Sequence, residues 1–465
     1  MNLKRNNGSF RDNRGHVYTY DDKVFRSITK YGKEQYLNLK NHNILNESIE
    51  NNFLIESEEI DKNLYDIKNQ NIEFLLEHKK IPFITYPYEW SFNQLKDAAV
   101  HHLKFQIFLL KKNFILRDSS AYNIQFIGSK PIFIDLLSID GYKENQLWTG
   151  YGQFCRQFLN PLILESKLNI NFNEFYKGSF EGISSNDLSK MLSYRNFLSL
   201  NTFSHIYLHG KSEILKNIKK KQNIEKINNK GISKRAYLAI LNQLKNWIEN
   251  LNLNNKNSTI WEKYADNNSY LDNEKNIKAE VIDTFCKKHK PLKIIDLGCN
   301  TGDYSKIALK SGAKYAIGYD FDHKAIDSAY LRAKKEELKF LTLYLDASNP
   351  SSSIGWNEQE RPGFKIRNKV DAVLALAFKH HLVIGKNIIM SECIDWITSI
   401  ANVGLIEFVP KNDPTVLEML RYREDIFNEY SEDVFVNCLE KRARIINVTK
   451  VNSSGRKIFE FTKNK

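Results

Sequence analysis

Three aspartates stand at the ends of consecutive apolar runs in the C-terminal half of the chain. Asp296 ends "KIID", Asp320 ends "YAIGYD" and Asp346 ends "FLTLYLD". The turn after the first run contains Gly298 and Gly302, which let the backbone approach a ligand, and the predicted helix that follows offers unpaired N–H donors. Asp296 would repel a pyrophosphate. A cofactor that carries an ammonium and a sulfonium group would instead be attracted to this acidic turn.

The spacing of these residues distinguishes the turn from a dinucleotide site. A dinucleotide-binding fingerprint reads GxGxxG, whereas this turn reads D-x-G-x-N-x-G and lacks the third glycine. Asp320, at the end of the next predicted strand, is well placed to accept hydrogen bonds from both hydroxyls of a ribose. Asp346 is placed to accept one from an adenine amino group. We expect Asp322, next to "HKAID", to cap a helix instead.

This series of strand-end acids resembles the class I S-adenosylmethionine-dependent methyltransferases, and the resemblance spans roughly residues 271–465. It implies S-adenosylmethionine as the cofactor. By that resemblance, the cofactor would lie in the turn and at the next two strand ends, with its methionine part against Asp296, Gly298, Cys299, Asn300 and Gly302, its ribose and an adenine face against Asp320 and Phe321, and its adenine edge against Asp346 and Ala347. Asn300 stands where many members of this class have glycine.

Two histidines follow the fourth apolar run, in "ALAFKHHLVIGKN". His380 and His381 are expected at the edge of the sheet where an acceptor would approach. A neutral imidazole there could remove the proton of an attacking hydroxyl, because its pKa lies near the working pH. Alternatively, the pair only opens a helix over the cofactor. The residues leave both interpretations open.

The segments near this edge narrow the class of acceptor. The Asn/Asp-Pro-Pro-Tyr motif of amino-methylating DNA enzymes does not follow the fourth run, and no Pro-Cys or Thr-Cys pair is present for attack on a pyrimidine. A hydroxyl or carboxyl acceptor that needs only proximity and a base is therefore the better hypothesis. The long polar segment "NPSSSIGWNEQERPGF", with Trp356, Glu360 and Arg361, is predicted to be an acceptor-binding lid.

A second set of polar residues lies in the N-terminal half. Asp118 and Asn123 stand in "LRDSSAYN", and Asp135 follows the apolar run "PIFI". The pattern resembles the catalytic loop and metal-binding strand of protein and aminoglycoside kinases, which implies a catalytic base in Asp118 and magnesium ligands for ATP in Asn123 and Asp135. However, the glycine of Asp-Phe-Gly and a Val-Ala-Ile-Lys strand are missing, and Arg26 is the nearest cation. A simple turn, with Asp118 and Asn123 bonding the backbone, is the alternative.

Motifs along the whole chain, among them "YPYEWSFNQLKDAA", "GQFCRQFLNPL", "GCNTGDYS" and "IEFVPKNDP", resemble a bacterial family of long S-adenosylmethionine-dependent methyltransferases. That family includes proteins related to rhizobial nodulation factors. The resemblance implies methyl transfer to an acceptor such as a glycan or surface saccharide. Two other hypotheses stay open: a bifunctional kinase–methyltransferase that modifies a glycan end, and a methyltransferase that binds RNA.

The elements that must position these residues fall into three zones. Residues 1–210 predict an α+β domain, either kinase-like or acceptor-binding, with a hairpin around Asp21 and Asp22 and a helix that begins at Ser91 with Gln94 completing a capping box. Residues 211–270 predict a helical connector. Residues 271–465 alternate strands and helices, which predicts a Rossmann-like, doubly wound α/β sheet with an antiparallel last strand.

The connector carries the densest group of basic residues, which comprises Lys216, Lys219, Lys220, Lys221, Lys226, Lys230, Lys234 and Arg235. Together with the formal net charge of +13, this group raises the hypothesis of an RNA contact. However, Lys, Asn and Ile are abundant along the whole chain, which indicates a coding bias towards A/T-rich codons. This bias favours the interpretation of the basic group as a solvated helix face.

The five cysteines show no spacing typical of metal ligands or of a disulfide framework, so we assign no metal ligands and expect a reducing compartment. The N-terminus has no apolar core of a signal peptide, and no apolar run approaches the ~20 residues that a membrane span needs. These features predict a cytoplasmic protein.

Overall fold

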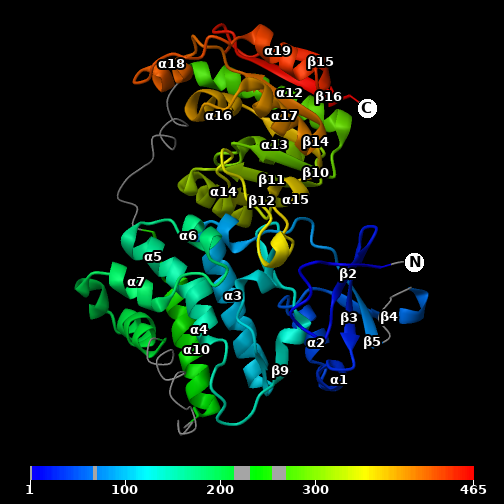
Figure 1. Ribbon diagram of the computed structural model, residues 1–465, viewed down its shortest axis with the longest axis vertical. Helices are drawn as coiled ribbons and strands as arrows, with labels where there is room; N and C mark the ends of the chain where they lie inside the picture. Colours follow the sequence, from blue (N-terminus) through cyan, green and yellow to red (C-terminus); the bar gives the residue numbers. More distant parts are fainter. Residues whose placement is uncertain (1–2, 66–70, 214–230, 254–268, 465) are drawn as a thin grey trace. The chain divides into compact units, whose positions relative to one another are not determined.

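A computed structural model of the chain describes residues 3–65, 71–213, 231–253 and 269–464 (Figure 1). Its internal contacts divide the chain into two compact units. Unit 1 comprises Met1–Asn255 and Ser353–Arg361, and unit 2 comprises Lys256–Ser352 and Pro362–Lys465. The zone boundaries at residues 210 and 270 stay a prediction, but this division differs from them in assigning the segment 353–361 to unit 1.

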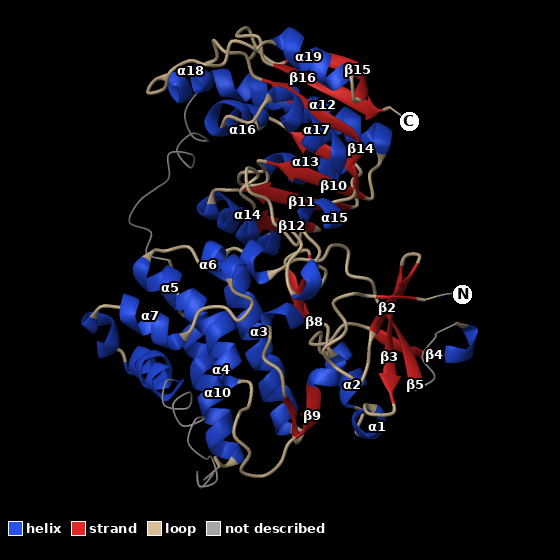
Figure 2. Cartoon of the chain, viewed as in Figure 1, coloured by secondary structure: helices blue, strands red, loops and turns tan. Residues whose placement is uncertain are grey.

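Unit 1 begins with an antiparallel five-stranded sheet, drawn as arrows in Figure 2. In pairing order its strands are β1 (Lys4–Arg5), β2 (Val17–Tyr20), β3 (Lys23–Thr29), β5 (Ile72–His78) and β4 (Ser57–Ile60). The hairpin of β2 and β3 turns at Asp21, whose φ is 49°, as the sequence predicted. Two short helices, α1 (Lys33–Asn41) and α2 (Ile44–Glu50), follow β3.

Helix α3 (Phe92–Lys111) of unit 1 begins where the sequence predicted. The hydroxyl of Ser91 accepts from the Gln94 backbone N–H, and the Gln94 side chain accepts from the Ser91 backbone N–H, which completes the capping box. Helix α10 (Lys234–Glu249) packs against α3, where Gln106 donates to the Tyr237 hydroxyl at 2.9 Å. Among the described residues, unit 1 also contains the α-helices α4 (Tyr151–Phe154), α5 (Asn160–Leu168), α6 (Asn173–Gly178), α7 (Ser185–Met191) and α8 (Leu200–Thr202).

Two small two-stranded sheets follow α3 and position the polar residues of the N-terminal half. One pairs β6 (Phe114–Leu116) with β9 (Ile139–Gly141), and the other pairs β7 (Ile124–Ile127) with β8 (Lys130–Phe133). Asp118 and Asn123 lie between β6 and β7, and Asp135 follows β8. The two strand pairs therefore bring the loop with Asp118 and Asn123 close to the segment that follows β8 and begins with Asp135.

Unit 2 is a seven-stranded sheet whose first five strands in pairing order run parallel. In that order the strands are β12 (Phe340–Tyr344), β11 (Tyr315–Asp320), β10 (Lys293–Leu297), β13 (Val370–Ala375), β14 (Ala401–Phe408), β16 (Lys457–Lys463) and β15 (Ala443–Lys450). β16 pairs antiparallel with both of its neighbours. This architecture confirms the predicted methyltransferase-like α/β fold with an antiparallel last strand.

Helices cover both faces of this sheet. Ile294 of β10 and Ala316 of β11 share a buried core with residues of α12, α13 and α14. On the opposite face, Tyr319 contacts Phe364 of α15, which stacks on Trp396 of α17. The α-helices described in unit 2 are α12 (Ser269–His289), α13 (Asp303–Lys310), α14 (His323–Lys335), α15 (Phe364–Arg367), α16 (Lys379–Lys386), α17 (Met390–Ile400), α18 (Pro414–Leu420) and α19 (Glu432–Glu440).

None of the helices in the described ranges combines the length and the apolar character that crossing a lipid bilayer requires. The basic residues Lys216, Lys219, Lys220, Lys221, Lys226 and Lys230 lie outside the described residues, and of the predicted basic group only Lys234 and Arg235 are described, at the start of α10.

Candidate functional site

The turn between β10 and α13 has the backbone conformation that its glycines predicted. Gly298 and Gly302 have φ of 74° and 84°, and a Cβ on Gly302 would lie 2.4 Å from a ring carbon of Phe340. Asn300 has φ of 49°, a left-handed conformation that asparagine tolerates better than most residues. This tolerance explains how Asn can stand where related turns have Gly. The backbone N–H groups of Gly298 and Cys299 donate to the Tyr319 carbonyl at 2.8 and 3.0 Å, which ties the turn to the end of β11.

Asp296 is a buried carboxylic acid beneath this turn. Its Oδ2 accepts a hydrogen bond of 2.7 Å from the Ser305 hydroxyl on α13. Burial raises the pKa of Asp296 to about 7, and the negative charge of Asp320 acts in the same direction. Burial disfavours the ionised carboxylate, and a nearby cation would favour it. The position of Asp296 therefore suits a positively charged group of a ligand.

Asp320 lies at the end of β11 and is bonded to the turn. Its Oδ2 accepts from the Asn300 backbone N–H at 2.8 Å and its Oδ1 from the Asp322 N–H at 3.0 Å. Burial raises the pKa of Asp320. Phe321, the next residue, leaves 52% of its surface exposed. Asp322 caps α14 by accepting from the N–H groups of Lys324 and Ala325, as predicted.

Asp346 follows the end of β12, next to Asp320. The backbone N–H of Leu345 donates to the Asp320 carbonyl at 2.9 Å, which joins the two strand ends. The Asp346 Oδ1 accepts from the backbone N–H and the hydroxyl of Ser348 at 2.9 and 2.6 Å, and Ala347 is half-buried between them. The structure thus brings the ends of β10, β11 and β12, with their three carboxylates, to one edge of the sheet.

The two predicted histidines lie at the start of α16. His380 is 1% exposed, and within the described part of the chain neither of its ring nitrogens has a hydrogen-bond partner. Burial lowers the pKa of His380 well below its usual value and that of His381 to about 4, so both rings are neutral near pH 7. A Cβ on Gly298 would lie 3.1 Å from Phe378, which brings the segment leading to the histidines against the glycine turn.

A buried charge pair beneath this segment was not predicted. Glu407 of β14 is fully buried and accepts from Lys278 Nζ at 2.7 Å and from the Ala377 backbone N–H at 2.8 Å. Ala377 has φ of 47°, so Glu407 holds a strained backbone position just before the histidines. The lone glutamate in the apolar run "GLIEFV" was the sequence signal for such a role.

Lys379, next to His380, is also buried. Its Nζ donates to the Tyr430 hydroxyl at 2.9 Å and lies 4.2 Å from the centre of the Phe408 ring and 4.3 Å from that of Tyr430. Burial lowers the pKa of Lys379 to about 7. With this pKa, a fraction of the Lys379 side chains is neutral near pH 7, which is compatible with an apolar site. The aromatic rings stabilise the protonated fraction through cation–π contacts.

In unit 1 the structure brings Asp118, Asn123 and Asp135 together. Asn123 Nδ2 donates to Asp118 Oδ2 at 3.2 Å, and the Ser138 hydroxyl donates to Asp135 Oδ2 at 2.6 Å. Burial raises the pKa of Asp118, and the charge of Asp135 adds to that effect. These residues, which the sequence spacing singled out, therefore lie close together in the folded chain. Asp118 also accepts from the Ser120 backbone N–H at 3.0 Å, the backbone bond that the turn interpretation expected.

The charges in this cluster do not fit a magnesium site as they stand. Arg26 Nη2 lies 2.9 Å from Asp135 Oδ1, and both side chains are mostly buried. The guanidinium thus already neutralises the carboxylate that the kinase resemblance assigned to the metal. Across the described ranges, no group of three or more His, Cys, Asp or Glu residues could hold a metal ion.

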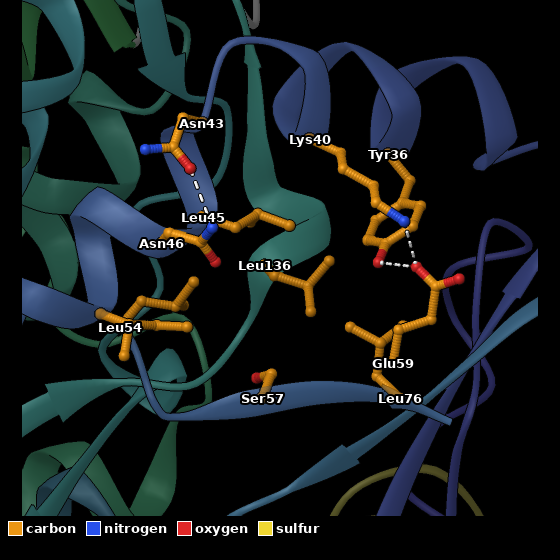
Figure 3. A pocket seen from close by; sticks show the side chains of 11 residues that line it. Tyr36, Lys40, Asn43, Leu45, Asn46, Leu54, Ser57, Glu59, Leu76 and Leu136 are labelled. Atoms are coloured by element: carbon orange, nitrogen blue, oxygen red, sulfur yellow. Dashed lines mark hydrogen bonds and ion pairs between the residues drawn. The ribbon is translucent and has the colours of Figure 1, made fainter. Parts of the chain in front are cut away.

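A cavity of about 160 Å³ lies in unit 1 among α1, α2, β4 and β5 (Figure 3). Leu136, the residue after Asp135, forms part of its apolar floor. At the rim, Glu59 Oε2 accepts from the Tyr36 hydroxyl and from Lys40 Nζ, both at 2.8 Å. Because these polar groups satisfy one another, we assign no chemistry to this cavity.

No family model matches the chain. The chain is 42% identical over 454 residues to the nodulation protein NoeA of Rhizobium meliloti (strain 1021), and the alignment covers 98% of this chain and 95% of that protein. The chain belongs to the NoeA family. This result confirms the end-to-end resemblance to nodulation-related proteins that the sequence motifs indicated.

Shorter likenesses concern methyltransferases. The ribosomal protein L11 methyltransferase of Photorhabdus laumondii subsp. laumondii is 42% identical over 59 residues, which cover 12% of this chain and 20% of that protein. The solved structure of magnesium protoporphyrin IX methyltransferase of Synechocystis PCC 6803, with bound S-adenosylmethionine, is 17% identical, covers 45% of this chain and 93% of its own, and has a TM-score of 0.32. The strand order of unit 2, its glycine turn and the L11 match agree, and this member of the NoeA family is an S-adenosylmethionine-dependent methyltransferase.

Proposed function

We propose that unit 2 transfers the methyl group of S-adenosylmethionine to an oxygen atom of a saccharide. The observation that carries the proposal is the edge formed by Asp296, Asp320 and Asp346, whose strands end side by side. Backbone hydrogen bonds join these ends, from the glycine turn to Tyr319 and from Leu345 to Asp320. When bound, the cofactor supplies an electrophilic methyl group on a sulfonium.

The residues at this edge fit the cofactor in charge and in hydrogen bonding. Asp296, an acid of raised pKa, would pair with the ammonium group. Asp320 accepts from the backbone N–H groups of Asn300 and Asp322, and its remaining acceptor capacity would serve the ribose hydroxyls. Phe321 offers an exposed ring to an adenine face, and Asp346 with Ala347 would meet the adenine edge. The open backbone of Gly298, Cys299, Asn300 and Gly302 would lie along the methionine part.

His380 is the proposed base. Burial keeps its imidazole neutral but lowers its pKa, so it is a weaker base than the sequence prediction assumed. Because its ring nitrogens lack partners in the described part of the chain, one of them would accept the proton of an acceptor hydroxyl that enters beside it, as the oxygen attacks the methyl carbon. Glu407 would act through the backbone, since it holds Ala377 just ahead of this histidine. His381 shares the neutral state and would bound the same space.

The experiment that tests the proposal measures cofactor binding by titration calorimetry. Asp320→Ala should weaken S-adenosylmethionine binding by about 10–100-fold, the loss of a charged hydrogen-bonding partner. Asp371→Ala is the matched control, because Asp371 accepts from the Lys293 N–H at the opposite end of the strands. Undiminished affinity in Asp320→Ala would remove Asp320 from the site. Labelled S-adenosylmethionine with a fractionated extract would then reveal the acceptor class.

For unit 1 we propose that it binds and shapes the acceptor. The ion pair between Arg26 and Asp135 argues against magnesium-dependent kinase activity, although Asp118, Asn123 and Asp135 lie together as the kinase resemblance implied. ATP binding that requires magnesium and is eliminated by Asp135→Ala would establish the bifunctional alternative. The RNA alternative rests on a basic group of which only Lys234 and Arg235 are described, and salt-sensitive RNA affinity would support it.

A further inference from the structure

An open pocket of about 340 Å³ lies within unit 1, between the N-terminal segment and the segment 353–361. Its lining combines two aromatic rings, one guanidinium and four side-chain amides, contributed by Phe10, Trp356, Arg5, Asn6, Asn7, Asn357 and Gln359. Flat rings beside several amides are a different chemistry from the carboxylates and histidines of unit 2.

The segment that carries Trp356 is firmly held. Glu360 is buried and forms a two-point contact with Arg11, with Nε–Oε1 and Nη2–Oε2 distances of 2.9 and 2.8 Å. The same carboxylate accepts from the Trp356 backbone N–H at 3.1 Å. Ile354 and Arg361 exchange two backbone hydrogen bonds of 3.0 Å, which close the base of the loop.

The tip of this loop is strained and leaves an aromatic ring in solvent. Asn357 and Glu358 both have φ of 54°, a conformation that is costly for glutamate in particular. Trp356 is 72% exposed although indole is among the groups that gain most from burial. A fixed, strained loop that presents an indole to water points to a ligand that covers it.

The amides next to the rings offer both donors and acceptors. Asn7 Nδ2 donates to Gln359 Oε1 at 2.9 Å, which holds the two side chains side by side and leaves Asn7 Oδ1 and Gln359 Nε2 without a partner among the described residues. Asn6 Oδ1 accepts from the Gly8 N–H at 2.9 Å, and the Asn6 NH₂ group has no partner among the described residues. Paired donors and acceptors of this kind match vicinal hydroxyl groups.

The charge of the pocket favours a neutral ligand. The Arg5 guanidinium donates from Nη2 to the Ser9 carbonyl at 2.9 Å and contacts His16 Nδ1 at 3.1 Å, so it is committed to the protein. Arg11 is likewise committed to Glu360. A nucleotide could stack on Trp356, but it would bring phosphates to a pocket whose cations are already paired.

We propose that this pocket binds a neutral saccharide, with the apolar face of a sugar ring on Trp356 and its hydroxyls on the amides of Asn6, Asn7 and Gln359. The inference rests on the proposed function, because it assigns a binding site to the saccharide acceptor of that methyl transfer. Trp356 stands in the chain segment that connects β12, after which Asp346 follows, to β13. One connection therefore supplies both a proposed cofactor residue and the sugar platform.

The test titrates the full-length protein with maltotetraose, cellotetraose and chitotetraose, by tryptophan fluorescence and by calorimetry. At least one of these should bind, Trp356→Ala should weaken it by about tenfold or more, and Trp356→Phe should retain most of the affinity. Tyr194→Ala, which removes another exposed aromatic ring of unit 1, is the matched control and should bind as wild type. S-adenosylmethionine binding is measured on every variant and should not change.

The outcomes separate the two proposals. No binding of any of the three saccharides, equal affinity in Trp356→Ala, or binding of ATP in their place would overturn the saccharide site while cofactor binding still stands. If the wild-type protein does not bind S-adenosylmethionine, the proposed function is overturned instead. Saccharide binding that depends on Trp356 in a protein that also binds S-adenosylmethionine supports both.

Discussion

Arg11 and Glu360, 349 positions apart in the sequence, form a two-point ion pair inside unit 1. Glu360 belongs to the connection between β12 and β13, so part of the chain that links two strands of the methyltransferase sheet is built into the N-terminal unit. The buried Glu360 carboxylate also accepts from the Trp356 N–H. This one carboxylate therefore fixes both the segment and its exposed indole.

Replacing Glu360 should release this segment. Glu360→Ala removes the acceptor of three hydrogen bonds, and we expect limited proteolysis between residues 353 and 361 to become several-fold faster because cleavage follows local opening. Glu360→Gln, which keeps the Trp356 contact but loses the charge, should be intermediate. An unchanged cleavage rate in Glu360→Ala would mean that the ion pair does not hold the segment.

The features of the fold that were predicted correctly depend on short stretches of sequence. The capping box at Ser91 and Gln94, the hairpin at Asp21 and the glycine turn at Gly298 each need only local spacing and backbone chemistry. The order of apolar runs was enough for the fold of unit 2, because parallel strands joined by helices have few arrangements. The clustering of Asp118 with Asn123 was visible for the same reason.

The features that were missed join distant parts of the chain. Glu407 was visible only as a lone acid in an apolar run, since its partner Lys278 lies 129 positions away. The segment with Trp356 and Glu360 was expected as a lid, and its place in unit 1 depends on Arg11 at the other end of the chain. Arg26 was recognised as the nearest cation, but no spacing indicated that it would pair with Asp135.

Asp296 should make the stability of unit 2 depend on pH. Burial raises its pKa in the folded chain to about 7, above the usual value of 3.8 that it regains on unfolding. The folded state therefore binds more protons between these values, and the free energy of unfolding should fall as pH rises from about 4 to 7, by on the order of 2–4 kcal/mol. Hydrogen exchange of β10 amides, measured across this range, reports the change.

Asp296→Asn is the control, because it keeps the size of the side chain but cannot ionise. We expect its protection factors to lose this dependence on pH. Because the cationic cofactor favours the ionised acid, wild-type affinity for S-adenosylmethionine should increase as pH rises from 5 to 8, and Asp296→Asn should abolish the increase. If the protection factors and the cofactor affinity of the wild type depend on pH as little as those of the variant, Asp296 ionises with an ordinary pKa.

His380 should affect the chemical step more than cofactor binding. His380→Ala is expected to lower kcat by about 10²–10⁴-fold with the S-adenosylmethionine Kd unchanged, since the lost group only accepts a proton. Burial keeps its pKa well below the usual value, so the wild-type rate should stay level as pH falls through 6.5. A rate that halves near pH 6.5 would assign the base to an ordinary, exposed histidine.

Arg26 and Asp135 offer the sharpest test of the N-terminal unit. Removing Asp135 leaves a mostly buried guanidinium unpaired, so Asp135→Ala should reduce the free energy of unfolding by about 1–3 kcal/mol, and Arg26→Ala by a similar amount. The double variant should lose less than the sum of the two, which a double-mutant cycle in denaturant measures. The exposed pair of Lys23 and Glu77 on the same sheet, at 2.9 Å, serves as the reference and should show little coupling.

The same variants decide whether the cluster retains a nucleotide site. If Arg26 takes the place of a metal ion, millimolar Mg-ATP should not raise the thermal midpoint of the wild type, because Asp135 has no free charge to offer. Freeing that carboxylate in Arg26→Ala should then create Mg²⁺ binding that the wild type lacks, with Asp118 and Asn123 beside it. A magnesium-dependent shift in the wild type that Asp135→Ala abolishes would instead show that the ion pair opens for nucleotide and that unit 1 is a second active site.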